Sequence, residues 1–280
     1  MNRRLALRDR RVAVGLTILL LLSVIAALAP ALSPYDPLLQ NDVVRERFQA
    51  PLSGAHGFHW LGTDQLGRDL LSRIIYGARI SLSVGLLAVA VSLILGSLIG
   101  FAAAAAGGVM ETFLMALTDV ALMFPRIVLL LALVSLWRPS LTLVVLALGF
   151  TGWMGIARLA RAEAHSILAR PFIEAARSAG LPTTRLMWRH VVPNALAPLL
   201  VATALGIGNA ITLEAGLAFL GLGVPAPAPS WGNMISAGRD VLVNAPWIAT
   251  FPGLAIVLAV MGCNLLADGL QHALNPQASR

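Results

Sequence analysis

The sequence predicts an all-α, polytopic membrane protein with six transmembrane helices. Two observations lead to this fold class: 58% of the 280 residues are hydrophobic and 12% are charged, and the charges are separated by long uncharged stretches. Soluble domains usually carry about twice that charged fraction. Because about 20 apolar residues in a helix cross the hydrocarbon core of a bilayer, each long uncharged stretch is a candidate span.

Five uncharged stretches are long enough to span. They lie between Arg11 and Asp36, Arg79 and Glu111, Arg138 and Arg158, Arg189 and Glu214, and Asp240 and Asp268, and hold 24, 31, 19, 24 and 27 residues. The apolar stretch 112–137 also counts as a span, although it contains Asp119 and Arg126. Prolines at 225, 227 and 229 predict a loop after the fifth span, because proline cannot continue a helix.

The first stretch is either an uncleaved transmembrane helix or a cleaved signal peptide, since Ala27-Leu28-Ala29 resembles a cleavage site. We favour an uncleaved helix, because the apolar run exceeds the ~7 to 15 residues of a signal peptide. In the second stretch, Gly96-x-x-x-Gly100 predicts close packing against another helix.

Arginine positions predict the orientation and the domain division. With the N-terminus in the cytoplasm, twelve arginines lie inside and seven outside, as the positive-inside rule favours. The division that follows is 1–35 for the N-terminal tail and first helix, 36–78 for a periplasmic segment, 79–268 for a five-helix core with a cytoplasmic loop at 159–190, and 269–280 for a cytoplasmic tail.

Composition excludes several function classes. All 20 basic residues are arginine, so there is no lysine for a Schiff base or for a P-loop, and any ATP must be bound by another chain. The lone Cys263 excludes an internal disulfide and a cysteine-based zinc cluster, and we expect it to pack in the core. Because most of the basic excess serves topology, we expect no nucleic acid partner, and we expect no metal site.

The cytoplasmic loop contains a short predicted helix. Pro171 suits the first helical position, Gly180 suits a left-handed C-terminal cap, and Pro182 prevents the helix from continuing. Phe172, Ala176 and Ala179 fall on one face of this helix. A helix of two or three turns is marginal alone in water, so we expect it either to dock in a groove of a cytoplasmic protein or to lie on lipid headgroups.

Three separated motifs resemble one family. Glu174-Ala175-Ala176 followed by Gly180 resembles the EAA loop of permease subunits of binding-protein-dependent ABC importers. The stretches His59 to Arg79 and Phe219 to Gly232 are similar to segments of the dipeptide, oligopeptide and nickel branch. The resemblance implies the type I ABC importer transmembrane fold in the bacterial inner membrane, with Phe172, Glu174, Ala175, Ala176 and Gly180 coupling to an ATPase.

The resemblance also implies the partners. These are a homologous second permease subunit, two ABC ATPase subunits that hold ATP and Mg, and a periplasmic or lipid-anchored substrate-binding protein. This chain would bind no cofactor and perform no bond chemistry, but would form half of a path for di- or oligopeptides. Nickel or another small solute is an alternative substrate.

Charged residues near the outer membrane edge predict an ion-pair network. Asp64 and Arg68, and Asp69 and Arg73, are each four residues apart, which favours pairing between neighbouring helical turns. We favour a solvated structural network, with a latch at an outer gate as the alternative. His56 and His59 are spaced for a metal but lack a third ligand, so we favour a solvated loop.

Three ionisable residues lie within or beside spans and are candidates for the path or gate. Asp119 and Arg126 are seven apart, which predicts one helical face with a kink at Pro125, and they either form structural ion pairs or line the path. Glu214 precedes a glycine-rich stretch that either hinges or packs tightly. We expect Trp231 and Trp247 at the outer interface.

Two rival functions follow from these residues. In an ion-coupled secondary transporter, Asp119 and Glu214 would carry protons or sodium, but the short cytoplasmic helix would have no role. A membrane-embedded enzyme is disfavoured, because no nucleophile, base and metal ligands converge in the sequence.

Overall fold

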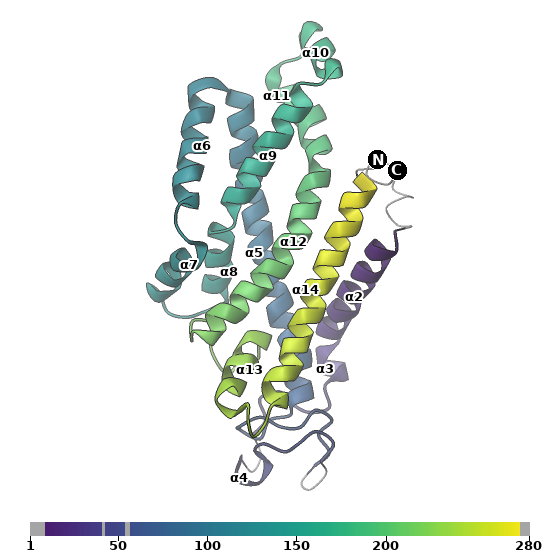
Figure 1. Ribbon diagram of the computed structural model, residues 1–280, viewed down its shortest axis with the longest axis vertical. Helices are drawn as coiled ribbons and strands as arrows, with labels where there is room; N and C mark the ends of the chain where they lie inside the picture. The colour runs from purple at the N-terminus through teal and green to yellow at the C-terminus, as the bar shows by residue number, and fades with distance from the viewer. Residues whose placement is uncertain (1–8, 41–42, 54–56, 275–280) are drawn as a thin grey trace.

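The computed structural model describes residues 9–40, 43–53 and 57–274, which form an elongated helical bundle (Figure 1). The long helices run roughly along the long axis, and the described residues contain no β-strand. The helices are α2 (Arg10–Ala27), α3 (Ala29–Leu32), α4 (Val43–Glu46), α5 (Leu70–Ala106), α6 (Gly108–Leu122), α7 (Arg126–Ser135), α8 (Leu141–Phe150), α9 (Trp153–Leu168), α10 (Pro171–Ser178), α11 (Thr183–Leu186), the π-helical η1 (Met187–Val191), α12 (Val192–Phe219), α13 (Trp231–Gly238), the 3₁₀ turn η2 (Arg239–Val241) and α14 (Trp247–Leu274).

The number of membrane spans equals the predicted six if one broken span is included. Five helical segments are long and apolar enough to cross a membrane, and α6 with α7 makes a sixth if the pair is one span. The predicted kink at Pro125 is present but is sharper than a kink within one helix, because the chain breaks there and bends by 81° between α6 and α7. The helix that contains the second span is longer than its uncharged stretch, since α5 begins at Leu70, before Arg79.

The helix α5 lies at the centre of the bundle and contacts α2, α8, α9 and α12. It begins where Asp69 accepts a hydrogen bond from the backbone N–H of Ser72 at 2.7 Å, a side-chain N-cap. It ends at Gly107, whose φ of 65° is favourable for glycine. At ~1.5 Å per residue its 37 residues cover about 55 Å, so it extends beyond the ~30 Å hydrocarbon core.

Small residues set the distance between α5 and α9, as the Gly96-x-x-x-Gly100 spacing predicts. A Cβ added at Gly96 would lie 2.6 Å from Ile156 Cβ, and one at Gly100 would lie 2.8 Å from Ala160 Cβ. On the other side of the bundle α2 runs along α14 (Figure 1), where a Cβ at Gly15 would lie 2.6 Å from the backbone of Leu266. These backbones approach because no side chain separates them.

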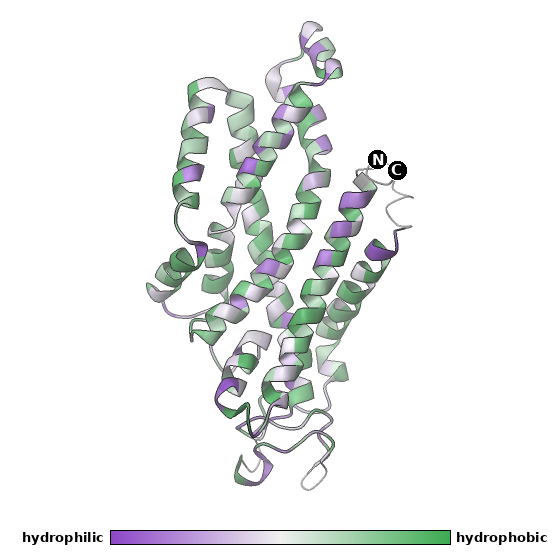
Figure 2. Cartoon of the chain, viewed as in Figure 1, coloured by the Kyte–Doolittle hydropathy of each residue, from purple (hydrophilic) through white to green (hydrophobic). Residues whose placement is uncertain are grey.

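The two ends of the bundle differ in structure. The helix α10 stands at one end, and the segments before α5 and around α13 form the other end (Figure 1). Figure 2 shows hydrophobic colouring along the long helices and more hydrophilic residues in α10 and in the opposite loops. The bundle therefore has an apolar middle between two polar ends, as a membrane-spanning fold requires.

We expect Gly96→Ala to destabilise the protein, because the new methyl group would meet the backbone and side chain of α9. Overpacking of this kind costs about 1–3 kcal/mol, which should appear as a lower melting temperature in detergent. The control is Gly155→Ala on α9, where an added Cβ meets nothing within 4 Å. Equal melting temperatures for the two variants would contradict the close α5–α9 packing.

Candidate functional site

The predicted short helix in the loop is confirmed as α10. Pro171 occupies its first turn, and Glu174 lies where the helix dipole favours an acid. Gly180 has a φ of 81°, and its N–H donates to the carbonyl of Arg177 at 2.9 Å. The N–H of Leu181 donates to the carbonyl of Ala176 at 3.2 Å, which completes a glycine-dependent helix end.

The apolar face of α10 that packs on the bundle differs from the prediction. Ile173 is the buried residue, with 1% exposure, and Ala176 packs beside it. Phe172 is 46% exposed and lies edge-on to the His190 ring, with centroids 6.2 Å apart. Ala179 is exposed. The predicted face of Phe172, Ala176 and Ala179 was therefore wrong as a single surface, because α10 is anchored through Ile173.

The anchor connects α10 with three membrane helices. Ile173 belongs to a buried apolar cluster with residues of α5, α9 and the continuous segment α11, η1 and α12. The cluster consists of Ala104, Ala164, Ile167, Ile173, Leu186, Met187, Val191 and Ala195. The outward surface of α10 carries Phe172, Glu174 and Ala175, all exposed. A displacement of α10 by a bound partner would thus act directly on α9 and on the start of α12.

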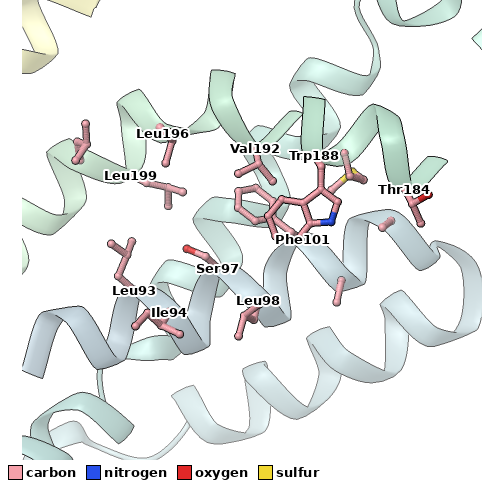
Figure 3. A pocket seen from close by; sticks show the side chains of 14 residues that line it. Leu93, Ile94, Ser97, Leu98, Phe101, Thr184, Trp188, Val192, Leu196 and Leu199 are labelled. Atoms are coloured by element: carbon pink, nitrogen blue, oxygen red, sulfur yellow. The ribbon is translucent and has the colours of Figure 1, made fainter. Parts of the chain in front are cut away.

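An apolar groove of about 470 Å³ lies between the end of α5 and the segment from α11 to α12. Figure 3 shows Leu93, Ile94 and Leu98 facing Val192, Leu196 and Leu199, with Trp188 and Thr184 nearer one end. No charged side chain lines the groove. It separates two helices without providing recognition groups for a charged solute.

The charged network near the start of α5 is buried rather than solvated, which corrects the prediction. Asp64, Arg68, Asp69 and Arg73 are 3–8% exposed. Arg68 Nη2 lies 2.7 Å from Asp64 Oδ2, so this predicted pair is confirmed, but it closes a loop and not a helical turn. Arg73 Nε lies 3.5 Å from Asp64 Oδ2, so the predicted pairing of Arg73 with Asp69 was wrong.

Asp69 has a different partner, His59. The Nδ1 atom of His59 lies 2.9 Å from Asp69 Oδ1, and the His59 side chain is buried. The prediction of a solvated histidine was therefore wrong for His59, while His56 lies outside the described residues. Asp69 thus links a loop residue to the first turn of α5 and fixes the segment that precedes this helix.

Two further hydrogen bonds attach this segment to the bundle. Arg73 Nη1 donates to the carbonyl of Pro37 at 3.1 Å, and Trp247 Nε1 donates to the carbonyl of Thr63 at 3.3 Å. The segment is consequently a folded cap over the ends of α5 and α14, with buried charges at its centre.

The break between α6 and α7 separates Asp119 from Arg126, so the prediction of one shared helical face was wrong. Asp119 is exposed and lies 3.9 Å from Arg158 Nε on α9. Arg126 Nη2 donates to the carbonyl of Leu148 at 3.1 Å, and its Nε lies 3.4 Å from Thr151 Oγ1. The two residues contact different parts of the α8–α9 segment.

Glu214 is fully buried where α12 meets α13. Its Oε1 accepts a hydrogen bond from Ser230 Oγ at 2.9 Å, while Oε2 is buried without a partner among the described groups. A Cβ on Gly232 would lie 3.1 Å from Oε2, so this glycine makes room for the carboxyl group. Glu214 therefore holds α13 against the end of α12.

The glycines after Glu214 have different environments. Gly221 has a φ of 79°, which a turn after α12 requires, and Gly223 is packed closely against Ala218. Gly216 has open space around its Cα. Gly221 therefore serves a turn and Gly223 serves close packing.

Two site features escaped the sequence analysis or differ from it. Trp231, expected at the interface, is 1% exposed and donates from Nε1 to the carbonyl of Ile74 at 3.0 Å. Glu111 Oε1 lies 2.7 Å from His165 Nε2 and also binds Arg161, joining α6 to α9. Residues about 50 positions apart carry no spacing signal, so this cluster had no signature in the sequence.

In the described part of the chain, no group of three or more histidine, cysteine or acidic residues is placed to hold a metal ion. Cys263 is buried, and its Cβ lies 3.4 Å from the position that a Gly208 side chain would take, so the predicted packing role is confirmed.

Two family models match this chain, one near the N-terminus and one over the C-terminal two thirds. Residues 92–280 match the family described as binding-protein-dependent transport system inner membrane component. Residues 3–51 match the N-terminal TM domain of oligopeptide transport permease C.

Curated relatives match over nearly the whole length. The dipeptide transport system permease protein DppC of Alkalihalophilus pseudofirmus is 39% identical over 96% of this chain and 87% of the relative. The di/tripeptide transport system permease protein DppC of Pseudomonas aeruginosa is 41% identical over 94% and 87%. The glutathione transport system permease protein GsiD of Pectobacterium atrosepticum is 38% identical over 98% and 89%.

A solved structure shares the fold. An inward-facing form of the MetNI methionine ABC transporter matches with a TM-score of 0.59 at 16% identity, covering 73% of this chain and 97% of that chain. At this identity the likeness concerns the fold alone.

We expect Asp64→Asn to destabilise the protein strongly, because it leaves the buried Arg68 and Arg73 without their carboxylate. Removal of one partner from a buried ion pair costs about 3–5 kcal/mol. The matched control is Asp240→Asn, an exposed acid whose replacement should change little. Thermal unfolding of both variants in detergent measures the difference, and similar curves would refute a structural role for the buried network.

Proposed function

The chain belongs to the family of binding-protein-dependent transport system inner membrane components, and we propose that it forms half of the path through which an ATP-driven importer moves short peptides. It is a permease subunit of an ABC importer. The assignment of a peptide substrate is supported by 38–41% sequence identity, over nearly the full chain, to relatives whose names specify dipeptide, tripeptide or glutathione transport. Nickel or another small solute is the alternative.

The proposed partners complete the transporter. A homologous second permease subunit forms the other half of the path, and two ATPase subunits bind ATP and Mg. A substrate-binding protein, periplasmic or lipid-anchored, delivers the peptide. This chain binds no cofactor and performs no bond chemistry in the proposal. An ion-coupled transporter, with Asp119 and Glu214 as carriers, is not supported by the family to which the chain belongs.

Coupling takes place at α10 in this proposal. The exposed Phe172, Glu174 and Ala175 insert into a cleft of the ATPase subunit, and Ile173 transmits the motion to α9 and α12 through the buried cluster. Binding of ATP draws the ATPase subunits together and favours the conformation open to the binding protein. The nucleotide shifts the equilibrium because it binds one conformation of the complex better than the other.

The same assignment fixes the orientation. If α10 lies in the cytoplasm, the segments before α5 and around α13 lie on the periplasmic side (Figure 1). Arg10 at the start of α2 is then near the cytoplasmic end, in agreement with the arginine distribution. On this basis we propose that both termini lie in the cytoplasm and that the chain lies in the bacterial inner membrane.

Uptake by the purified complex in proteoliposomes tests the substrate. We expect uptake of a radiolabelled dipeptide that requires ATP on the side of the membrane that the ATPase subunits face. It should also require the binding protein on the opposite side. Nickel uptake under the same conditions, without dipeptide uptake, would support the alternative substrate instead.

The coupling assignment is tested by Glu174→Lys. Reversal of a charge at the centre of a docked surface should lower peptide-driven ATPase activity and uptake roughly tenfold or more. Glu163→Lys on α9 makes the same charge change outside α10 and should leave both rates near the wild-type values. Equal rates for Glu174→Lys and the wild type would remove α10 from the coupling mechanism.

A further inference from the structure

Arg126 is a cation at a break in a membrane span. It is the first residue of α7, directly after the 81° bend that follows α6. Figure 1 shows α7 on the side of the bundle, between the α10 end and the opposite end. Its two hydrogen-bond partners, the Leu148 carbonyl and the Thr151 hydroxyl, are uncharged. Within the described part of the chain no carboxylate oxygen lies within 4.0 Å of it.

The other charges on the neighbouring helices are arranged differently. Glu111 on α6 pairs with Arg161 and His165 on α9. Asp119 on α6 lies 3.9 Å from Arg158 on α9. Arginines inside a bilayer are costly and usually pair with an acid or face a water-filled path. No described acid pairs with Arg126, so the guanidinium group is left either to face a water-filled path or to bind an anion that another chain or the solute supplies.

The guanidinium group has both free donors and space. A guanidinium carries five N–H donors, of which the two hydrogen bonds use two, leaving three. Gly152 provides room, since a Cβ at this position would lie 3.0 Å from Arg126 Nη2. The Arg126 side chain is half-buried, and the adjoining Met123 and Phe124 are 80% and 55% exposed. One side of the group is therefore held by α8, and the other side is accessible.

We propose that Arg126 is a carboxylate-binding residue on the translocation path, where its guanidinium receives a carboxylate of the peptide as it passes the bend between α6 and α7. The planar fork of a guanidinium matches the two oxygens of a carboxylate. This inference rests on the proposed function, because each imported peptide with a free C-terminus brings a carboxylate into the apolar region. The contact replaces part of the hydration that this group loses there.

The test uses the complete transporter in proteoliposomes with a dipeptide loaded on its binding protein. Arg126→Gln removes the charge, Arg126→Lys keeps it, and Arg138→Gln removes an exposed arginine after α7 as the control. We expect Arg126→Gln to lower the maximal uptake rate roughly tenfold or more, with the half-saturating concentration of loaded binding protein unchanged. Arg126→Lys keeps the charge without the planar fork, so it should recover only part of the rate, and Arg138→Gln should match the wild type.

Complex assembly distinguishes the source of the carboxylate. For a peptide carboxylate, the yield of purified complex and its ATPase rate without substrate are the same in Arg126→Gln as in the wild type. A lower yield of complex would assign the anion to the partner permease and overturn the proposal. Normal uptake by Arg126→Gln would overturn it as well. Failure of the wild-type complex to import any peptide would refute the proposed function, and this inference with it.

Discussion

The structure depends on the need to satisfy every backbone polar group within an apolar medium. Continuous helices meet this need by themselves, and interruptions require other donors and acceptors. The breaks after α6 and after α8 lie close together, and side chains from other elements donate hydrogen bonds to the free carbonyl groups there. Arg126 from the first break donates to the Leu148 carbonyl at the second, and Ser92 on α5 donates to the adjacent Gly149 carbonyl at 2.9 Å. The bend is therefore part of the packed bundle.

The two ends of the bundle are held together by different interactions, buried ion pairs at one end and an apolar contact at the other. At the α5 start, buried charges of Asp64, Arg68 and Arg73 hold a folded cap of loops, where removal of one member leaves the others unpaired. At the α10 end, an apolar contact through Ile173 holds a short helix with an exposed outer surface. The first arrangement favours one rigid geometry, and the second leaves a surface free for a partner that moves.

Sequence reasoning predicted the parts governed by local rules. Span positions follow from charge-free length, and α10 follows from Pro171 and Gly180, whose backbone requirements are local. Most of the failures involve tertiary contacts. Helical spacing paired Asp69 with Arg73, but the loop brings His59 to Asp69 and places Asp64 against Arg73. The burial of Trp231 depends on a contact with α5 about 150 residues away, which no local pattern encodes.

The segment from α11 through η1 to α12 forms one uninterrupted helical column from Thr183 to Phe219. Its 37 residues, at ~1.5 Å each, reach about 55 Å. Its N-terminal end packs in the Ile173 cluster. Near its C-terminal end Glu214 accepts a hydrogen bond from Ser230, at the start of α13. In the proposed coupling, a tilt at the α10 end is carried along this column across the membrane, where it displaces α13.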